Sequence, residues 1–343
     1  MAKIIISLVL IVNAGFIFGQ KTKIINIDTA ITTTLNLSDV AEKVTPVVLN
    51  VNEYISNIFL TNEYLFLSSM CSVVQCDLSG RIIRNIDCGD YVADNITCDT
   101  IAKKLYVPVG EKIKCFDFSG NLKEEYPVNA RPLFCLYQNG VLWIQSYRIE
   151  DDRSAIYEIK KIDLSTGKLI TLPFRRRDAP VSNRNGSLAN VSNTCYLTTF
   201  DKSIIASFDA DSILYQIKGN NVTHMVRWNI RPPASTLGMK KFHINGFVGK
   251  YLFINYSRIS YDRKGDRTGD WHLYLEDMKS GKKYNTKGIN DDVFHTGICT
   301  KPKPLYQNGC FYFLKNRDEF KEKSIGNIPL KNGPVLFIVQ TKK

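Results

Sequence analysis

A turn-forming motif recurs along the first half of the chain, and it constrains the fold more than any other feature. Residues 77–80 read Asp-Leu-Ser-Gly, residues 117–120 read Asp-Phe-Ser-Gly, and residues 163–167 read Asp-Leu-Ser-Thr-Gly. In each copy the Asp and Ser side chains can hydrogen-bond the turn backbone, while the Gly takes a positive φ. Short runs rich in Val, Ile, Leu, Tyr and Phe flank every copy. The motif therefore predicts β-hairpin turns that repeat along the chain.

Each copy belongs to a three-strand unit that cannot bury both of its faces alone and must stack on its neighbours. Six such units are recognisable, at residues 64–86, 105–126, 141–172, 204–228, 251–281 and 310–340. About 54 residues per unit is near the roughly 40–50 of a propeller blade once loop insertions are allowed. The sequence thus predicts an all-β, six-bladed β-propeller. A pair of β-sandwiches and an open β-solenoid are the alternatives.

The two ends of the chain favour a closed ring. The last strand, at residues 335–339, has no strand after it, and the early candidate strands, at residues 23–37 or 44–51, belong to no earlier unit. An N-terminal strand that completes the last blade leaves no sheet edge bare. Long insertions concentrate in the second half, where we expect them to rim one propeller face. They lie at residues 173–193, 231–242, 258–270 and 317–333.

The first nineteen residues have the pattern of a secretory signal peptide. Lys3 precedes a run at residues 4–12 in which only Ser7 is polar, and a plausible cleavage point lies before Gln20. This run is too short to span a bilayer, and no later stretch approaches the roughly 20 apolar residues that a membrane helix needs. We expect residues 1–19 to be removed and residues 20–343 to form a single propeller domain. That domain would be exported to the periplasm, the cell surface or the medium.

Nine cysteines lie at irregular spacings, mostly inside apolar runs. Buried free thiols are the favoured interpretation, and the odd number leaves at least one unpaired within the chain. Cys299 and Cys310 bracket a candidate hairpin and are the first pair to test for a disulfide bond. The spacing does not fit a zinc site, and we expect no cofactor and no resident metal.

Positive charge is concentrated in the second half of the chain. Residues 1–170 carry 17 Lys and Arg against 19 Asp and Glu, whereas residues 171–343 carry 28 against 14. Because an exported protein rarely meets nucleic acid, we expect the partner to be an anionic glycan, lipid headgroups or a cell-envelope protein. Salt-sensitive binding should then be lost when residues 175–177 are changed to Ala. The predicted ligand-binding residues are Arg175, Arg176, Arg177, Arg258, Arg263, Lys264 and Trp271.

Catalysis is the competing hypothesis, and it is the less favoured one. His243 and His295 each precede the first strand of a unit, which would place both near the central channel. With Asp292 they could form an acid/base group or a metal site in a glycan-directed hydrolase or lyase. The chain lacks a Gly-x-Ser-x-Gly elbow, a P-loop and a His-Glu-x-x-His motif. No catalytic residue is therefore assigned, and these three residues are the candidates.

The features above resemble one known family. The Gly19-Gln20 junction, the repeated Asp-Leu-Ser-Gly turns and the close of the chain at residues 332–338 are similar to exported six-bladed propeller proteins abundant in Bacteroidetes. The resemblance covers residues 26–343 and implies a TolB-like or NHL-like propeller; it implies no particular reaction. Many members are lipoproteins, but no Cys follows the signal here. Residues 290–292 are similar to an acidic patch of the family.

Overall fold

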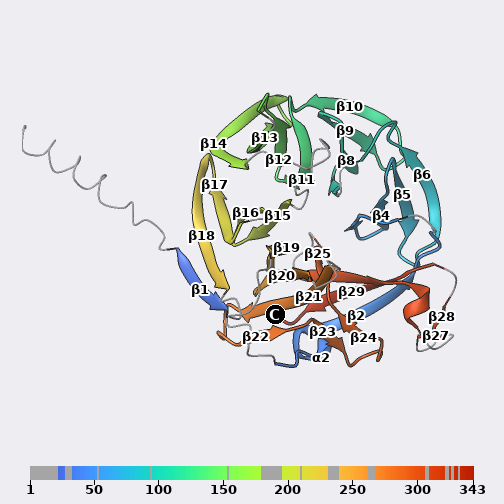
Figure 1. The fold of residues 1–343 in the computed structure, drawn as a ribbon. Helices are drawn as coiled ribbons and strands as arrows, with labels where there is room; N and C mark the ends of the chain where they lie inside the picture. The colour runs from blue at the N-terminus through green and yellow to red at the C-terminus, as the bar shows by residue number, and fades with distance from the viewer. Residues whose placement is uncertain are drawn as a thin grey trace, which may run out of the picture.

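The computed structural model describes residues 22–27, 33–51, 54–92, 95–152, 154–178, 195–208, 211–230, 239–261, 267–305, 309–320, 324–325, 328–330 and 333–343, without the side chains of 178, 195, 239–245 and 257–270. Six main sheets are arranged as the blades of a six-bladed β-propeller (Figure 1). The predicted all-β fold is confirmed.

Blades 1 to 3 each consist of four consecutive antiparallel strands, with the first strand of each innermost. Their bounds are β3 (Asn57–Leu60), β4 (Tyr64–Ser68), β5 (Ser72–Asp77) and β6 (Ile82–Asp87); β7 (Thr97–Asp99), β8 (Lys104–Val109), β9 (Lys112–Asp117) and β10 (Leu122–Pro127); β11 (Arg131–Gln138), β12 (Val141–Ile149), β13 (Ala155–Asp163) and β14 (Lys168–Asp178).

Blades 4 and 5 repeat this order, and blade 6 combines both ends of the chain. The strands are β15 (Cys195–Phe200), β16 (Ser203–Phe208), β17 (Ile213–Lys218) and β18 (Asn221–Ile230); β19 (Met239–Val248), β20 (Tyr251–Tyr261), β21 (Arg267–Asp277) and β22 (Lys283–Thr286); β25 (Lys303–Leu305), β26 (Cys310–Lys315), β29 (Val335–Thr341) and β2 (Ala41–Val48).

The remaining elements are short. They are α2 (Leu37–Val40), η1 (Arg317–Glu319), and the small hairpins β23 (Ile289–Asp291) with β24 (Gly297–Cys299) and β27 (Ser324–Ile325) with β28 (Ile328–Pro329). Among the described residues, no helix is long and apolar enough to cross a membrane.

Closure by an N-terminal strand is confirmed. β2 pairs antiparallel with β29, with Val48 opposite Val335 and Ala41 opposite Thr341, so the start of the chain forms the outermost strand of blade 6. The earlier segment β1 (Lys23–Ile27) takes a different place, because it pairs in parallel with β18 and adds a fifth strand to blade 4. Of the two segments predicted to complete the last blade, the second, at residues 44–51, is therefore the one that does so.

The repeated turns form as their sequence predicts. Asp77 accepts hydrogen bonds from the Ser79 and Arg81 backbone N–H groups, at 3.0 Å each, and Gly80 has a φ of 85°. Asp163 accepts one from the Ser165 N–H at 2.9 Å in the same way. Each of these turns joins the third strand of a blade to its fourth, so the carboxylates that recur along the sequence stabilise turns.

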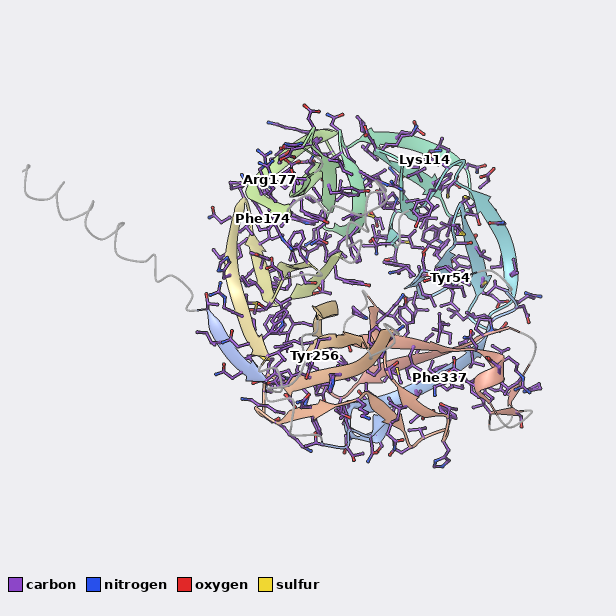
Figure 2. All side chains as sticks on the ribbon, in the orientation of Figure 1. Tyr54, Lys114, Phe174, Arg177, Tyr256 and Phe337 are labelled. Atoms are coloured by element: carbon purple, nitrogen blue, oxygen red, sulfur yellow. The ribbon has the colours of Figure 1, made fainter. Side chains whose placement is uncertain are left out.

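Apolar clusters fill the space between blades (Figure 2). The described residues form six such clusters, and each joins two neighbouring blades around the ring. In blade 6, Phe337 stacks on Phe313 with ring centroids 4.7 Å apart. In blade 5, Tyr256 stacks on His272 at 5.0 Å. Each blade therefore buries apolar side chains against its neighbours, as the stacking of the units predicts.

The two ends of the propeller differ in their connections. We call short-turn face the end at which the first strand of each blade turns into the second, and long-connection face the opposite end. Antiparallel order places the strand ends that precede the predicted insertions on the long-connection face, because these ends belong to second or fourth strands. All four are partly wrong as loops. Residues 173–178 belong to β14, residues 239–242 belong to β19, and residues 258–261 and 267–270 extend β20 and β21 as a long hairpin, while β27 and β28 lie within 317–333.

The cysteines that the structure describes are all free thiols. Cys299 lies in β24 and Cys310 in β26, and the suggested disulfide bond between them is absent. Burial raises the pKa of the Cys299 thiol to about 12, so this thiol stays protonated and packs as an apolar group. The side chain of Cys195 lies outside the described residues.

Candidate functional site

The predicted arginines lie at the end of β14, on the long-connection face of blade 3. Side chains alternate along a strand, so Arg175 and Arg177 point to one side of the sheet and Arg176 to the other. The facing strand β13 places Glu158 opposite Arg175 and Tyr157 opposite Arg176. The three arginines therefore occupy two different environments.

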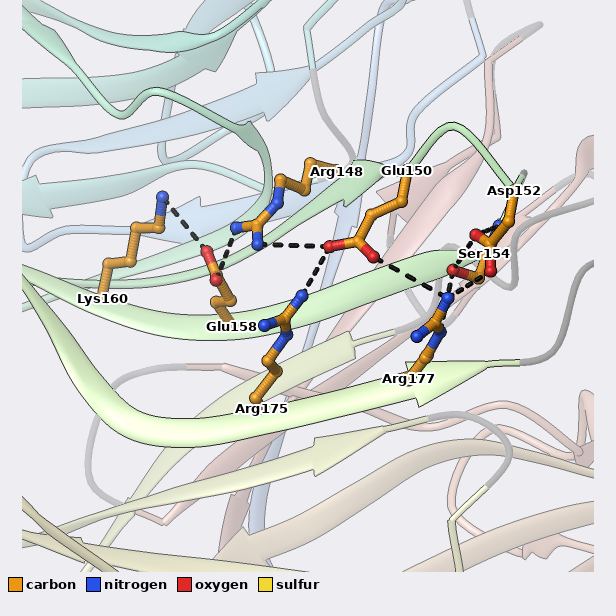
Figure 3. A network of polar contacts seen from close by, with 8 residues as sticks. All are labelled: Arg148, Glu150, Asp152, Ser154, Glu158, Lys160, Arg175 and Arg177. Atoms are coloured by element: carbon orange, nitrogen blue, oxygen red, sulfur yellow. Dashed lines mark hydrogen bonds and ion pairs between the residues drawn. The ribbon is translucent and has the colours of Figure 1, made fainter.

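Arg175 and Arg177 belong to a network of alternating charges that we call the arginine network (Figure 3). Glu150 lies at its centre and pairs with three guanidinium groups, those of Arg148, Arg175 and Arg177. Asp152 pairs with Arg177, and hydrogen bonds from Ser154 hold the pKa of the Asp152 carboxyl below its usual range. Each exposed arginine is thus already partnered by a carboxylate.

The inner end of the network is more deeply buried. Glu158 pairs with Arg148 at 2.6 Å and with Lys160 at 3.4 Å, and the Lys160 amino group donates a hydrogen bond to the Val128 carbonyl at 3.0 Å. Four cations and three carboxylates make up the whole arginine network: Arg148, Lys160, Arg175 and Arg177 with Glu150, Asp152 and Glu158. The net charge of the arginine network is therefore small, although Arg175 and Arg177 come from a run of three consecutive arginines.

Arg176 packs between blades 3 and 4. Its guanidinium lies 5.7 Å from the ring centroids of both Tyr157 and Phe208, and 3.5 Å from the Asp211 carboxylate. Its side chain is only 18% exposed. These contacts assign Arg176 to the packing between blades, next to a small hollow of about 350 Å³.

Of the other predicted ligand residues, Arg258 and Trp271 lie on the paired strands β20 and β21. Arg258 belongs to β20, but its side chain lies outside the described residues, as do Arg263 and Lys264 altogether. Trp271 lies in β21, where the Lys301 amino group sits 4.3 Å from its ring centroid.

Two of the three predicted catalytic residues, Asp292 and His295, share the turn between β23 and β24, whereas His243 belongs to a different element. His243 belongs to the inner strand β19, with its side chain outside that part. His295 is exposed in the turn between β23 and β24, away from the six inner strands, so its expected place at the channel is wrong. Asp292, in the same turn, accepts hydrogen bonds from the Ser38 N–H and hydroxyl. No group of three or more His, Cys, Asp and Glu among these residues could hold a metal.

A larger pocket, of about 800 Å³, lies on the short-turn face. Its lining comes from the ends of inner strands and the adjoining turns of blades 3 to 6, together with the last residues of the chain. We call it the lysine pocket, because five lysines belong to its lining: Lys202, Lys250, Lys279, Lys342 and Lys343. Asp201 is the only carboxylate side chain among the described lining residues.

Two of the five lysines are already engaged. Lys250 pairs with Asp277 at 2.9 Å, and the Lys342 amino group donates to the Ser38 carbonyl at 2.8 Å. Burial raises the pKa of Asp277, but hydrogen bonds from Lys250 and from the Lys279 and Ser280 N–H groups outweigh it and hold that pKa at about 2. Asp277 is therefore a carboxylate that orders the blade 5 turn.

The other three lysines of the lining have no carboxylate partners among the described residues. Within the described residues, Lys202, Lys279 and Lys343 make no ion pair, and all three are exposed. Lys202 has a φ of 61° and lies with Asp201 in the two-residue turn between β15 and β16. The floor between the lysines is apolar and includes Phe200, Phe247 and Met278. An apolar floor with unpaired cations at its edge can accept an anionic ligand.

Sequence reasoning missed this pocket because its residues are far apart in the chain and belong to short turns. One signal was present: Asp201-Lys202 and Gly249-Lys250 each put a lysine in the turn that follows an inner strand, and Lys342-Lys343 follows the last strand. In a ring, these three positions meet at one face. Lys202 and Lys250 have no basic neighbour in the sequence, so a search for clusters of charge passes over these two.

Comparisons with known proteins identify structures with a similar fold. No family model and no curated protein matches the sequence. Among solved structures, the chain is similar to a Bacteroides fragilis protein that is described as exported. The two are 10% identical, the match covers 94% of this chain and 100% of that one, and the TM-score is 0.56. It is also similar to a DUF4221 family member from Bacteroides vulgatus, with 10% identity over 88% and 97% and a TM-score of 0.50. At this identity the likeness establishes a shared propeller fold.

Proposed function

We propose that the chain is a propeller binding module that holds an anionic ligand in the lysine pocket. The observation that carries this proposal is the set of three unpaired lysines, Lys202, Lys279 and Lys343, around an apolar floor. A ligand with negative charge gains from all three, and no carboxylate partner of theirs has to be displaced. Binding, rather than a reaction, is the role that this arrangement supports.

Electrostatics favours the lysine pocket over the arginine network. A charge pair at 4 Å gains about 1 kcal/mol in bulk water and about 4 kcal/mol at the effective dielectric near a protein surface. In the arginine network much of this gain is already taken by Glu150, Asp152 and Glu158. A ligand there must compete with an internal carboxylate for each guanidinium. The arginine network, with Arg175 and Arg177, is accordingly the second candidate surface.

We also propose that the protein is exported. Residues 1–19 would act as a signal peptide and residues 20–343 as one propeller domain, placed in the periplasm or on the cell surface. The Bacteroides fragilis neighbour is described as exported, and the spacing around Gln20 suits cleavage. In that location the ligand classes are an anionic glycan and an acidic segment of a cell-envelope protein.

Calorimetry with a matched pair of polymers tests the proposal. Polygalacturonate carries a carboxylate on every sugar, whereas its methyl ester has the same backbone without the charge. We expect the protein to bind polygalacturonate at low salt, to bind it at least tenfold more weakly at about 300 mM salt, and to bind the ester weakly throughout. Equal affinity for both polymers, or the absence of binding to polygalacturonate at low salt, would contradict the proposal.

A further inference from the structure

Two cysteines lie opposite each other where the β5–β6 hairpin of blade 1 ends. Ser72 of β5 pairs with Asp87 of β6, so Cys71 and Cys88 occupy the next position outward in the same register. The Cys88 N–H donates a hydrogen bond to the Cys71 carbonyl at 3.1 Å, which continues the strand pairing to this position. Cys71 and Cys88 are therefore cross-strand neighbours at the end of the hairpin.

The geometry of this position suits a disulfide bond. Directly opposed residues of an antiparallel pair have Cα atoms about 4.5–5.5 Å apart, within the range of roughly 4.4–6.8 Å that a disulfide spans. Side chains alternate along a strand, so Cys71 points to the same side as Val73, and Cys88 to the same side as Ile86. Val73 and Ile86 both pack between blades 1 and 2. The two thiols therefore lie on one face of the hairpin.

The two thiols differ in their access to solvent. Cys71 is exposed, whereas Cys88 is 1% exposed and packs in the apolar cluster between blades 1 and 2. Burial raises the pKa of the Cys88 thiol to about 12, the nearby Lys114 ammonium lowers this pKa, and the nearby Cys71 thiol raises it. The Lys114 amino group also donates a hydrogen bond to the Cys88 carbonyl at 2.7 Å. An oxidant in solution therefore meets Cys71 first, and Cys88 reacts second, beside a fixed positive charge.

We propose that Cys71 and Cys88 form a disulfide bond that joins the two strands at the end of the β5–β6 hairpin. In the thiol form, Cys88 Sγ donates only a weak hydrogen bond, to the Ile86 carbonyl at 3.6 Å, and the bond to Cys71 would replace it. The proposed export would place the pair in an oxidising compartment, where disulfide bonds persist. This inference goes beyond the lysine pocket, whose lining includes no residue of this hairpin.

The bond forms by thiol–disulfide exchange with a small-molecule disulfide such as oxidised glutathione. The Cys71 thiolate attacks one glutathione sulfur, which forms a mixed disulfide and releases one glutathione thiolate. The Cys88 thiolate then attacks the Cys71 sulfur, which forms the bond within the chain and releases the second glutathione. In total the two protein thiols lose two electrons and two protons, and the glutathione disulfide is reduced to two thiols.

A second pair of neighbouring cysteines in the same chain is the matched control. Cys98 lies in β7 and Cys135 in β11, the contacting inner strand of the next blade. Burial and the nearby Cys135 thiol raise the pKa of the Cys98 thiol well above its ordinary value. Cys98 is 4% exposed and Cys135 0%, so neither thiol meets an oxidant in solution. This pair should stay reduced in the folded protein.

Disulfide mapping tests the proposal. The folded, fully reduced chain is incubated with oxidised glutathione, denatured and alkylated, and its peptides are sequenced by mass spectrometry. We expect Cys71 and Cys88 to be linked in most molecules, and Cys98 and Cys135 to be alkylated. Cys71→Ser should remove the link and leave Cys88 alkylated. The oxidised protein should unfold at least about 3 °C above the reduced one, and Cys71→Ser should abolish this difference.

Three results would overturn the proposal. In the first, Cys71 stays unmodified or carries glutathione while Cys88 remains a thiol, which would show that the two sulfurs do not meet. In the second, Cys71 is linked to Cys71 of another molecule. In the third, the link forms but the unfolding temperature does not rise, so the bond does not hold the hairpin. The proposed function is tested by polygalacturonate binding alone, so the two fail independently.

Discussion

The two basic regions of this propeller differ in what their charges face. In the arginine network, Arg175 and Arg177 point at Glu150 and Asp152, and the positive charge is largely neutralised within the protein. In the lysine pocket, on the opposite face, three amino groups have no carboxylate partner among the described residues. A segment rich in basic residues can therefore offer a partner little free positive charge, because carboxylates of the same protein already neutralise it.

Charge reversal in the lysine pocket should have the largest effect. Changing Lys202, Lys279 and Lys343 together to Glu replaces three attractions with three repulsions. We expect polygalacturonate affinity at low salt to fall at least about 100-fold, or about 3 kcal/mol. A variant with Glu at Lys43, Lys168 and Lys287, three exposed lysines outside the pocket lining, has the same net charge and should lose less than about tenfold. Equal losses in the two variants would remove the distinction between the regions.

Changes in the arginine network should act on stability instead. Arg175→Ala with Arg177→Ala removes two of the three guanidinium partners of Glu150. Because both arginines are more than half exposed, we expect a loss of about 1 kcal/mol in the free energy of unfolding, measured in urea. Glu150→Gln added to this variant should recover part of the loss. Polygalacturonate affinity should change less than about threefold, and a loss comparable to that of the lysine variant would move the site to this face.

Asp277, whose carboxylate orders the blade 5 turn beside the lysine pocket, should make the stability of the protein depend on pH. The pKa of Asp277, at about 2, lies below its ordinary value of 3.8, so its stabilising contribution is fully present above about pH 4 and is lost as the pH falls toward 2. Asp277→Asn should cost about 1 kcal/mol at pH 7, and denaturation curves of the two proteins should converge near pH 2. A difference that is constant across this range would show that the ion pair with Lys250 adds no stability.

Release of the arginines should give the smallest effect. In the background of the three lysine-to-Glu changes, Glu150→Gln removes the central carboxylate of the arginine network. Polygalacturonate affinity at low salt should then rise about threefold, because the Arg175 and Arg177 charges become available. Asp39→Asn, at an exposed carboxylate that is neither in the arginine network nor in the pocket lining, is the control for the added net charge. Equal gains in both would show that Glu150 does not mask these arginines.

The fold was more predictable than the site. The second, third and fourth strands of blades 1 to 4 follow from short apolar runs, joined in blades 1 to 3 by Asp-Ser-Gly turns, and both are local signals. The inner strands escaped recognition, since β7 has only three residues and carries no periodicity of its own. The hairpin of β20 and β21 was mistaken for a loop because its outer end is rich in charge.

The site depends on contacts that no short stretch of sequence contains. Glu150 and Arg175 are 25 residues apart, and the pairing of β12 with β13 and of β13 with β14 brings them together. Lys202 and Lys343 belong to blades 4 and 6, and they share a pocket because the inner strands of blades 4, 5 and 6 lie next to one another in the ring. Local patterns can place turns, whereas the pairing of charges requires the three-dimensional ring.

Lysine footprinting tests the central claim most directly. The protein is acetylated with and without saturating polygalacturonate, and the modified peptides are measured by mass spectrometry. The account predicts that the ligand protects Lys202, Lys279 and Lys343, while Lys43, Lys161 and Lys168 keep their reactivity. Unchanged reactivity at the three pocket lysines, with protection of Lys161 and other groups of blade 3, would contradict it.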